Sequence, residues 1–336
     1  MTEMLVNLRD IAASDVTRFG PKAANQALLG RAGLPIPEGF CLDVSAYRRQ
    51  LESLGLLESA RNAATLTGIE ARQLVSEVRI GLFDSPIVAD VLDPLLEAWH
   101  ELVAETGART VVRSSALSED LADSSFAGQY ETFLDIGNEE DFLTAIRACW
   151  AALWSPRALR YMESHKIDLA DTAMGLCIQE LIDARASGGG MSQSADGSLT
   201  LTATWGLGTT IAQGEVVPDR YILSRDSELL ETFPGRTQHS VGCEHHSAGS
   251  KTLTKPDIAD FGPCLSKAQA TELSGYMLRA EALMGEGVEI EWAQNERGIR
   301  LLQARPLQME TSTALDETWS GHPGLRGQPS GTGSAT

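Results

Sequence analysis

The stretch VVRSSALSEDLADSSFAGQYETFLDI, from Val111 to Ile136, joins a β-branched strand to a positive charge and then to a loop of small residues. Arg113 lies at the end of that strand, where the phosphate of a ligand could meet it. The serines and Gly128 that surround the acidic residues disfavour regular structure and let backbone N–H groups turn toward an anion. The stretch is therefore a candidate phosphate-binding loop. Its spacing alone is equally typical of an acidic surface loop that follows a buried strand.

The composition describes an acidic chain that can fill two hydrophobic cores. Its 336 residues exceed what one compact core usually holds, and 43% of them are hydrophobic. A formal charge of −19 argues against a nucleic-acid partner, because phosphate backbones need net neutralisation by Lys and Arg. Any phosphate site must therefore be a small region of positive charge on an otherwise acidic protein.

The targeting and cysteine patterns are those of an intracellular protein. The chain has no run of about 18 apolar residues, and its start, MTEMLVNLRD, lacks a signal-peptide pattern. We therefore expect a cytoplasmic protein with no membrane partner. The cysteines are scattered without the spacing of a metal site or a disulfide framework, and we interpret them as small apolar side chains: Cys41, Cys149, Cys177, Cys243 and Cys264.

The segment from Lys22 to Arg31 is predicted to be a helix, because its apolar residues form one stripe. Pro21 fits the first helical turn, and Gly33 fits the end of the helix. Lys22 would then lie near a helix N-terminus, where free N–H groups and the helix dipole favour anions. On the spacing alone, a solvated surface lysine is the simpler interpretation.

Other segments predict scaffold without visible chemistry. The region from Val44 to about Val103 is helical, with a break near Asp84–Pro86. The segment Asp141–Met162 predicts two helices separated at Pro156, and its aromatic stripe is more typical of a core than of a ligand site. The run MGLCIQELI, Met174–Ile182, is predicted to be a buried strand by its apolar content and its length.

Two alternating segments near the end of the chain predict a hairpin. In VEIEWAQ, period-two alternation places Glu289 and Glu291 on one face. In IRLLQARPL, the same alternation groups Leu301, Gln303 and Arg305. The intervening NERG predicts a turn, so that the two strands pair.

In such a hairpin, Glu291 lies near Gln303. A carboxylate beside a carboxamide supplies hard oxygens for Mg²⁺, and Arg305 could hold phosphates bidentately. The half-exposed polarity of an ordinary hairpin explains the same residues, and the sequence pattern alone favours that interpretation.

Four segments resemble one protein family in the same order. RSSALSEDLADSSFAGQYETFL is similar to the signature of the nucleotide-binding domain of phosphoenolpyruvate synthase, pyruvate phosphate dikinase and rifampin phosphotransferase. GPKAANQALLGRAGLPIPEGFCLDVSAY (Gly20–Tyr47) resembles the N-terminal lysine motif of this family, and TWGLGTTIAQGEVVPDRYIL (Thr204–Leu223) resembles its central glycine motif. VEIEWAQNERGIRLLQARPL (Val288–Leu307) resembles its closing strand pair. The segments span nearly the whole chain, so the resemblance is at the level of a domain.

The resemblance implies an α+β fold, namely an ATP-grasp-like two-lobed nucleotide-binding domain with antiparallel sheets and flanking helices. The implied N-terminal lobe, with the phosphate loop, covers residues 1–180, and the C-terminal lobe, with the metal-binding strands, covers residues 181–310. Residues 311–336 are polar and rich in Gly, Ser and Pro, which is typical of a linker, here toward a histidine swivel domain that this sequence lacks. The implied cofactors are ATP and Mg²⁺.

The resemblance also implies roles for individual residues. Lys22, Arg113 and Arg305 are implied to contact the nucleotide phosphates and to carry the catalysis. The implied nucleotide-binding residues, which include backbone groups at the adenine edge, are Lys22, Arg113, Ser115, Gly128, Gln179, Glu180, Ile182 and Arg305. Glu291 and Gln303 are implied to be the Mg²⁺ ligands.

The chain departs from the family pattern in two places. Relatives usually read something like SGVMFTADP where this chain has ASGGGMSQSADG, from Ala186 to Gly197. Because glycine costs about 0.5–1 kcal/mol per strand position, we expect this strand to be frayed or to become a loop. Thr209 stands where relatives commonly carry Glu, so any role of that acid is absent. Asp219 still matches, although a Pro–Asp turn explains it equally well.

The resemblance implies half of a longer reaction. Relatives pass a phosphoryl group from ATP to a histidine on a separate swivelling domain, in a segment that ends in Thr/Ser-x-His-Ala. This chain has no such segment, and we interpret the His245–His246 pair as part of a solvated loop. The implied chemistry is cleavage of ATP to AMP and phosphate, with the β-phosphoryl group passed through a partner histidine. We expect the chain to be a piece of a longer enzyme or a separate subunit that has such a partner.

The implied final acceptor is a small molecule with a hydroxyl group, bound by an acceptor-binding domain of that partner. An antibiotic hydroxyl and a phenol rank equally, and pyruvate ranks behind them. A non-catalytic nucleotide-sensing module with the same fold is the alternative, which the departures at Gly188–Gly190 and Thr209 permit. The intact set of phosphate-binding and metal-binding residues argues against it, because a sensor could dispense with the metal ligands.

Overall fold

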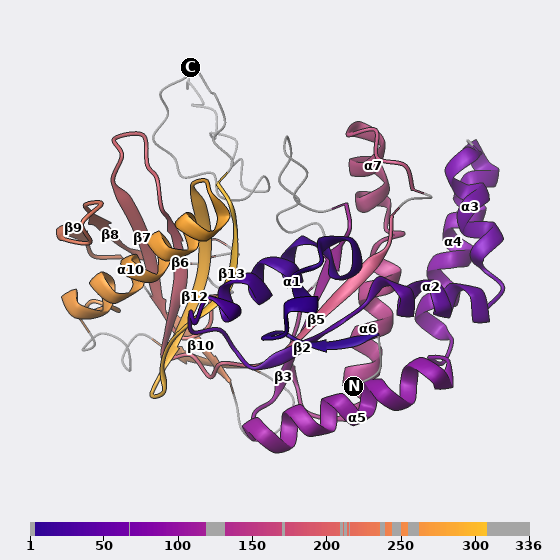
Figure 1. The fold of residues 1–336 in the computed structure, drawn as a ribbon, viewed down its shortest axis with the longest axis horizontal. Helices are drawn as coiled ribbons and strands as arrows, with labels where there is room; N and C mark the ends of the chain where they lie inside the picture. The colour runs from indigo at the N-terminus through magenta and orange to yellow at the C-terminus, as the bar shows by residue number, and fades with distance from the viewer. Residues whose placement is uncertain are drawn as a thin grey trace, which may run out of the picture.

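The computed structural model describes residues 4–307, with gaps at 67, 119–131, 170–171, 209–210, 212–213, 215, 236–238, 244–249 and 255–261. The described part contains two large antiparallel sheets, a separate two-stranded ribbon and flanking helices (Figure 1). This arrangement confirms the predicted α+β class. The phosphate loop with Gly128, the departure at Thr209, the His245–His246 pair and the predicted linker at 311–336 lie outside the described residues.

The first sheet is formed by the N-terminal half of the chain. Its five strands run in the order β1-β2-β5-β3-β4. They are β1 (Leu5–Asn7), β2 (Gly39–Leu42), β3 (Thr110–Ala116), β4 (Thr132–Ile136) and β5 (Met174–Glu180). Every residue of β5 is buried, which confirms the buried strand predicted from MGLCIQELI. The alternation divides β5 between two cores, because Leu176 and Ile178 belong to one and Cys177 belongs to the other.

The second sheet is formed by the C-terminal half. Its six strands run in the order β13-β12-β6-β7-β8-β9. They are β6 (Ala186–Met191), β7 (Leu199–Trp205), β8 (Asp219–Leu223), β9 (Leu229–Phe233), β12 (Val288–Asn295) and β13 (Gly298–Pro306). The separate ribbon pairs β10 (His239–Cys243) with β11 (Ser250–Thr254). No described strand of either large sheet crosses residue 181, and the predicted lobe boundary at 180 stays a prediction.

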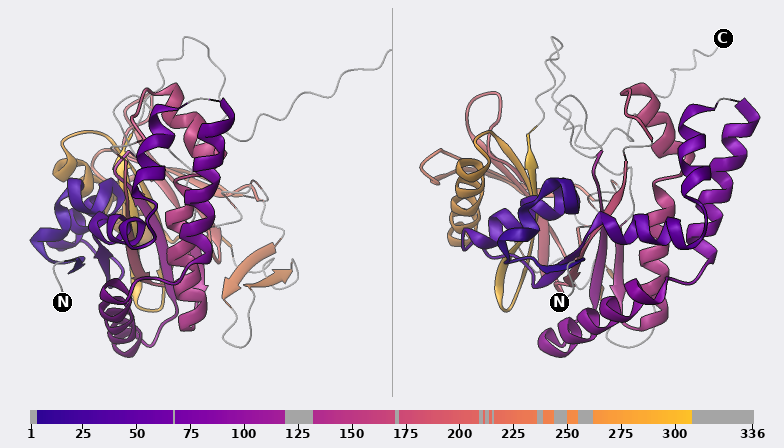
Figure 2. Two further views of the ribbon diagram at one scale, coloured as in Figure 1. Left: turned by 90° about the vertical axis from the view of Figure 1, so that its right-hand side faces the viewer. Right: turned by 45° about the vertical axis from the view of Figure 1, so that its right-hand side comes forward.

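Helices cover both sheets and fill the space between them (Figure 2). The helices associated with the first sheet are α2 (Val44–Ser53), α3 (Leu57–Thr65), α4 (Gly68–Asp84), α5 (Ala89–Thr106), α6 (Glu139–Ala152) and α7 (Pro156–Ser164). The break between α4 and α5 confirms the predicted break near Asp84–Pro86. The second sheet is covered by α10 (Lys267–Met284), while η1 (Ile11–Ser14) and α1 (Val16–Arg31) lie beside the junction of the two sheets.

The second hydrophobic core reaches across both sheets and includes residues of α1. Its buried members include Phe19, Ala23 and Ala27 of α1, Cys41 and Cys177 of the first sheet, and Trp292 and Leu301 of the second. Helix α1 therefore packs the two halves of the chain together, in addition to carrying Lys22.

The strand with three glycines corrects one expectation. Gly188, Gly189 and Gly190 neither fray nor form a loop, because β6 is an inner strand that pairs with β12 on one side and β7 on the other. A Cβ atom on Gly188 would lie 1.9 Å from the Thr202 carbonyl oxygen. The neighbouring strand comes so close that only glycine fits there, and pairing on both edges offsets the conformational cost of glycine.

The aromatic stripe and Asp219 both have structural roles. Trp150 and Trp154 are fully buried, and the Trp154 indole N–H donates to the Tyr47 hydroxyl at 2.8 Å, which confirms that the stripe is core. Asp219 begins β8 and does not form a turn. Its carboxylate accepts hydrogen bonds from the backbone N–H of Gly235 at 2.6 Å and from that of Cys264 at 2.8 Å. This buried carboxylate therefore ties the loops after β9 and before α10 to the sheet.

The close approach of β7 to β6 can be tested with two matched glycine variants. We expect Gly188→Ala to lower the free energy of unfolding by about 1–3 kcal/mol, because the new methyl group would overlap the backbone of β7. Gly189→Ala should have a much smaller effect, since its methyl group would meet the nearest atom, the Ile290 carbonyl oxygen, at 3.4 Å. Urea denaturation of both variants measures the difference. Equal losses would contradict the close approach as the reason for glycine.

Candidate functional site

The N-terminus of the main part of α1 rests on the end of β3. Gly20 has a non-helical backbone, with φ of 75° and ψ of 166°, so the regular helix begins at Pro21 as predicted. The backbone N–H of Ala23 donates to the Ser115 hydroxyl at 3.2 Å, and a Cβ atom on Gly20 would lie 2.3 Å from the Ser115 carbonyl oxygen. The close approach requires glycine, and it brings half-buried Lys22 next to the strand that carries Arg113.

Arg113 reaches from the first sheet to the second. Its guanidinium Nη1 lies 3.5 Å from Oε2 of Glu291 on β12, although 178 positions separate the two residues in the chain. The side chain is 14% exposed, and its Nε is buried without a hydrogen-bond partner in the described part of the chain. A buried donor of this kind costs free energy unless an acceptor is present, which fits a site that receives an anion.

The hairpin of β12 and β13 forms as predicted, with Glu291 opposite Gln303 and Glu289 opposite Arg305. The Arg305 guanidinium forms an ion pair with Glu289, at 2.5 Å from Nη2 and 3.0 Å from Nε. Arg305 is therefore held in place by a neighbour on the same hairpin. The carboxylate of Glu291 remains half-exposed, beside the carboxamide of Gln303.

The predicted assignment of β13 side chains to the two faces of the strand is wrong at one position, because the hairpin contains a β-bulge. The register shifts between Glu291 and Trp292, so Leu301 does not share a face with Gln303 and Arg305. Leu301 is fully buried in the second core, and its backbone N–H donates to the Pro35 carbonyl at 2.7 Å. Strict alternation could not reveal this, because a bulge adds one residue to the strand without any marker in IRLLQARPL.

At the bulge, the hairpin contributes apolar side chains to a small cluster. Leu302 packs in a small cluster with Ile182 and Ala293, together with Ala184 and Leu207. Ala293 lies two residues beyond Glu291 on β12, and therefore on the same face of the strand. Along this face the order is thus an arginine ion pair, then a carboxylate opposite a carboxamide, and then an apolar cluster.

The end of β5 meets the same apolar cluster through Ile182, which is 6% exposed. Gln179 is buried, and its Nε2 has no hydrogen-bond partner among the described residues. Glu180 is held by the backbone N–H of Glu38, which donates to Oε1 at 3.1 Å. The structure therefore brings these three residues, which were predicted to lie near the nucleotide, to the junction of the two sheets and leaves one buried amide available as a donor.

Two residues of this junction were missed by the sequence analysis. The Asn25 side chain donates to the Ala304 carbonyl at 3.2 Å, and the Gln26 side chain donates to the Leu301 carbonyl at 2.7 Å. Both amides lie on α1 and reach β13 across the junction. Their signal was weak, because polar residues beside an alanine stripe are also typical of a solvated helix face.

The donor set at the hairpin fits Mg²⁺. Glu291 and Gln303 offer hard oxygens at directly opposed positions, and Mg²⁺ is usually held by one or two carboxylates together with phosphate oxygens and water. The described residues contain no group of three or more His, Cys, Asp or Glu side chains that could form a metal cage of their own. A cation at this hairpin would therefore depend on oxygens from a bound ligand.

The family model described as pyruvate phosphate dikinase, AMP/ATP-binding domain, matches residues 16–320. This range contains every residue to which the sequence analysis assigned a role in binding or catalysis. In the described part of the chain, no helix combines the length and the apolar content needed to cross a bilayer.

Curated relatives share this region. The chain is 32% identical over 292 residues to the uncharacterized phosphotransferase YvkC of Bacillus subtilis, covering 86% of the chain and 33% of that protein. It is 29% identical over 344 residues to the phosphoenolpyruvate synthase of Aeropyrum pernix, covering 90% and 42%. It is 30% identical over 319 residues to the rifampicin phosphotransferase of a Streptomyces species, covering 90% and 36%. The chain thus spans less than half the length of these relatives.

Solved structures show weaker likeness. The ATP-grasp ligase PsnB, complexed with a minimal precursor, aligns with a TM-score of 0.30 and 14% identity over 89% of this chain and 55% of that chain. The protein PH1788 from Pyrococcus horikoshii aligns with a TM-score of 0.37 and 10% identity, over 89% and 97%. Identity this low carries no information about function.

The contact between α1 and β3 generates a prediction about stability. Ser115→Ala removes the acceptor for the buried N–H of Ala23, and we expect it to lower the free energy of unfolding by about 1 kcal/mol. Ser45→Ala, at an exposed position near the start of α2, should change it by far less. Thermal and urea unfolding of the two variants give the comparison. Identical unfolding of the two variants would show that the hydrogen bond does not hold the helix.

Proposed function

Because the chain belongs to the family of pyruvate phosphate dikinase AMP/ATP-binding domains, we propose that it binds Mg-ATP between its two sheets and serves an ATP-dependent phosphotransferase. The order of groups along the hairpin carries this proposal. Arg305, the Glu291–Gln303 pair and the Leu302 cluster follow one another in the order of a triphosphate, a metal ion and a base. The family membership and the two antiparallel sheets support an ATP-grasp-like arrangement.

In this proposal, cations from both halves of the chain hold the phosphates. Lys22 lies at the start of the regular part of α1, Arg113 points from β3 toward β12, and Arg305 lies on β13. Phosphoryl transfer requires mainly positioning and neutralisation of developing charge, so these three side chains form a sufficient electrostatic set. Gly128, in the predicted phosphate loop, stays a prediction.

Glu291 and Gln303 are proposed to hold Mg²⁺, which would neutralise charge on the phosphate oxygens. In the structure, the guanidinium of Arg113 lies 3.5 Å from the Glu291 carboxylate. The base is proposed to lie against Ile182 and Leu302, within reach of the unpartnered amide of Gln179. This position would give a buried donor its acceptor and would cover apolar surface from both halves of the chain.

The relatives are longer than this chain, so the complete reaction is proposed and not shown. We propose that ATP is cleaved to AMP and phosphate, and that the β-phosphoryl group passes through a histidine on a partner swivel domain or subunit. The acceptor would be a hydroxyl group of a phenol or an antibiotic, or pyruvate. Action in the cytoplasm stays a prediction. A nucleotide sensor with the same fold remains the alternative, and turnover distinguishes the two.

The metal ligands are tested by the magnesium dependence of ATP affinity. We expect Glu291→Gln to weaken Mg-ATP binding about tenfold or more, because it removes a charged oxygen ligand. Binding of ATP without magnesium should change little. Glu296→Gln, at the exposed turn of the same hairpin, serves as the matched control. Calorimetry with and without MgCl₂ gives both values, and an unchanged magnesium effect in Glu291→Gln would exclude this residue as a ligand.

The catalytic role is tested by AMP formation. The chain should produce AMP from ATP at an appreciable rate only when mixed with a polypeptide that carries the Thr/Ser-x-His-Ala segment. Arg305→Gln should abolish this activity, because it removes a proposed phosphate contact, while Arg61→Gln, at an exposed position on α3, should retain it. Chromatographic separation of AMP measures the rates. Tight ATP binding without turnover in any mixture would instead favour the sensor.

A further inference from the structure

The outer edge of β13 is held by side chains of α1. In the described order of the second sheet, β13 is the outermost strand, so one of its edges faces no other strand of that sheet. The Gln26 amide donates to the Leu301 carbonyl at 2.7 Å, and the Asn25 amide donates to the Ala304 carbonyl at 3.2 Å. The helix therefore supplies the donors that a neighbouring strand would otherwise supply.

The two carbonyls that α1 holds are three residues apart, and this spacing depends on the β-bulge. In a regular strand, the backbone groups of alternate residues point to the same edge, so carbonyls on one edge are separated by an even number of residues. The register shift between Glu291 and Trp292 adds one residue to β13 and lets Leu301 and Ala304 face the same side. The bulge and the two amides of α1 therefore match one another.

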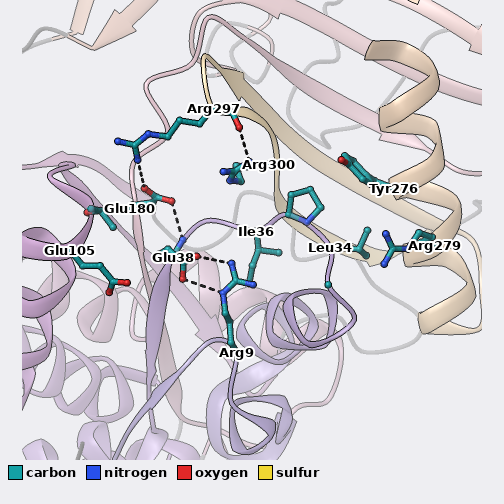
Figure 3. A pocket seen from close by; sticks show the side chains of 13 residues that line it. Arg9, Leu34, Ile36, Glu38, Glu105, Glu180, Tyr276, Arg279, Arg297 and Arg300 are labelled. Atoms are coloured by element: carbon teal, nitrogen blue, oxygen red, sulfur yellow. Dashed lines mark hydrogen bonds and ion pairs between the residues drawn. The ribbon is translucent and has the colours of Figure 1, made fainter. Parts of the chain in front are cut away.

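The segment after α1 makes a third contact with the same part of β13. The backbone N–H of Leu301 donates to the Pro35 carbonyl at 2.7 Å, so both backbone groups of Leu301 are bound by α1 or by the segment that follows it. Leu34 and Ile36, on either side of Pro35, line a pocket together with Arg300 of β13 (Figure 3). The bulged part of the strand is thus fixed by three hydrogen bonds from one side.

We propose that Asn25 and Gln26 are positioning residues for the magnesium site, and that they act through Gln303. The two carbonyls that they hold belong to residues before and after Gln303 in the chain. Arg305, by contrast, has its own support from the ion pair with Glu289. Residues that orient a metal ligand typically change metal affinity about 10- to 100-fold when they are lost. The inference rests on the proposed function, because the role of Gln303 as a ligand does.

The same face of α1 carries Lys22. This lysine precedes Asn25 by three positions and Gln26 by four, so the three side chains lie on one side of the helix. The two amides therefore connect a proposed phosphate contact in the first half of the chain to a proposed metal ligand in the second. A change in the seating of α1 on β13 would move the metal ligand relative to the phosphates.

The anchoring of β13 is tested by hydrogen exchange in protein that contains neither nucleotide nor magnesium. We expect Asn25→Ala to speed exchange of the amides of residues 300–305 about fivefold, because one hydrogen bond that holds the strand is lost. Gln26→Met, which removes the donor and keeps a side chain of similar length, should act in the same direction. Asn62→Ala, at an exposed position on α3, is the matched control. Unchanged exchange in both variants, with circular dichroism showing that they are folded, would overturn the anchoring.

The positioning role is tested by calorimetry of ATP binding with and without MgCl₂. We expect Asn25→Ala to weaken Mg-ATP binding about tenfold and to change binding of metal-free ATP far less. The double variant Asn25→Ala, Gln303→Ala should bind Mg-ATP no more weakly than Gln303→Ala alone, because the first residue acts through the second. Additive losses, or equal losses with and without magnesium, would overturn the positioning role. A magnesium effect that survives in Gln303→Ala would refute the proposed metal site and the positioning role with it, while the exchange result would still stand.

Discussion

The packing of α1 against both sheets is the interaction on which the rest of the structure depends. One end of the helix hydrogen-bonds to Ser115 on the first sheet, and its side chains Asn25 and Gln26 hydrogen-bond to backbone carbonyls of β13 on the second. Between these contacts, small alanines allow the helix to lie close to both sheets. The relative position of the cations that we propose to bind phosphate, which come from both halves, is therefore set mainly by one helix.

Much of this arrangement could be predicted from local patterns. The helix start at Pro21, the buried strand β5, the aromatic core and the hairpin each have a short-range signal in the sequence. Two features had none. Gly188 of β6 is required by the approach of a neighbouring strand, and the bulge in β13 is tied to the Pro35 carbonyl far away in the chain. Local propensity could not anticipate either, because tertiary contacts determine both.

The candidate site was predictable as a set of residues but not as a geometry. The sequence and the family resemblance named Arg113 and Glu291, yet nothing in either segment indicates that the two side chains approach one another across the sheets.

Chemical labelling of the two thiols beneath α1 can measure how often the two halves of the chain separate. Cys41 and Cys177 lie opposite one another on β2 and β5, and both are buried in the core that the helix covers. Burial raises the pKa of Cys41 well above its ordinary value, so its thiol is unreactive while the helix stays in place. We expect a thiol reagent to reach these two thiols when α1 moves away from the first sheet, so the rate at which these two residues are labelled reports this opening. Any ligand that holds the two halves together lowers this labelling rate, whether or not the protein transforms the ligand chemically.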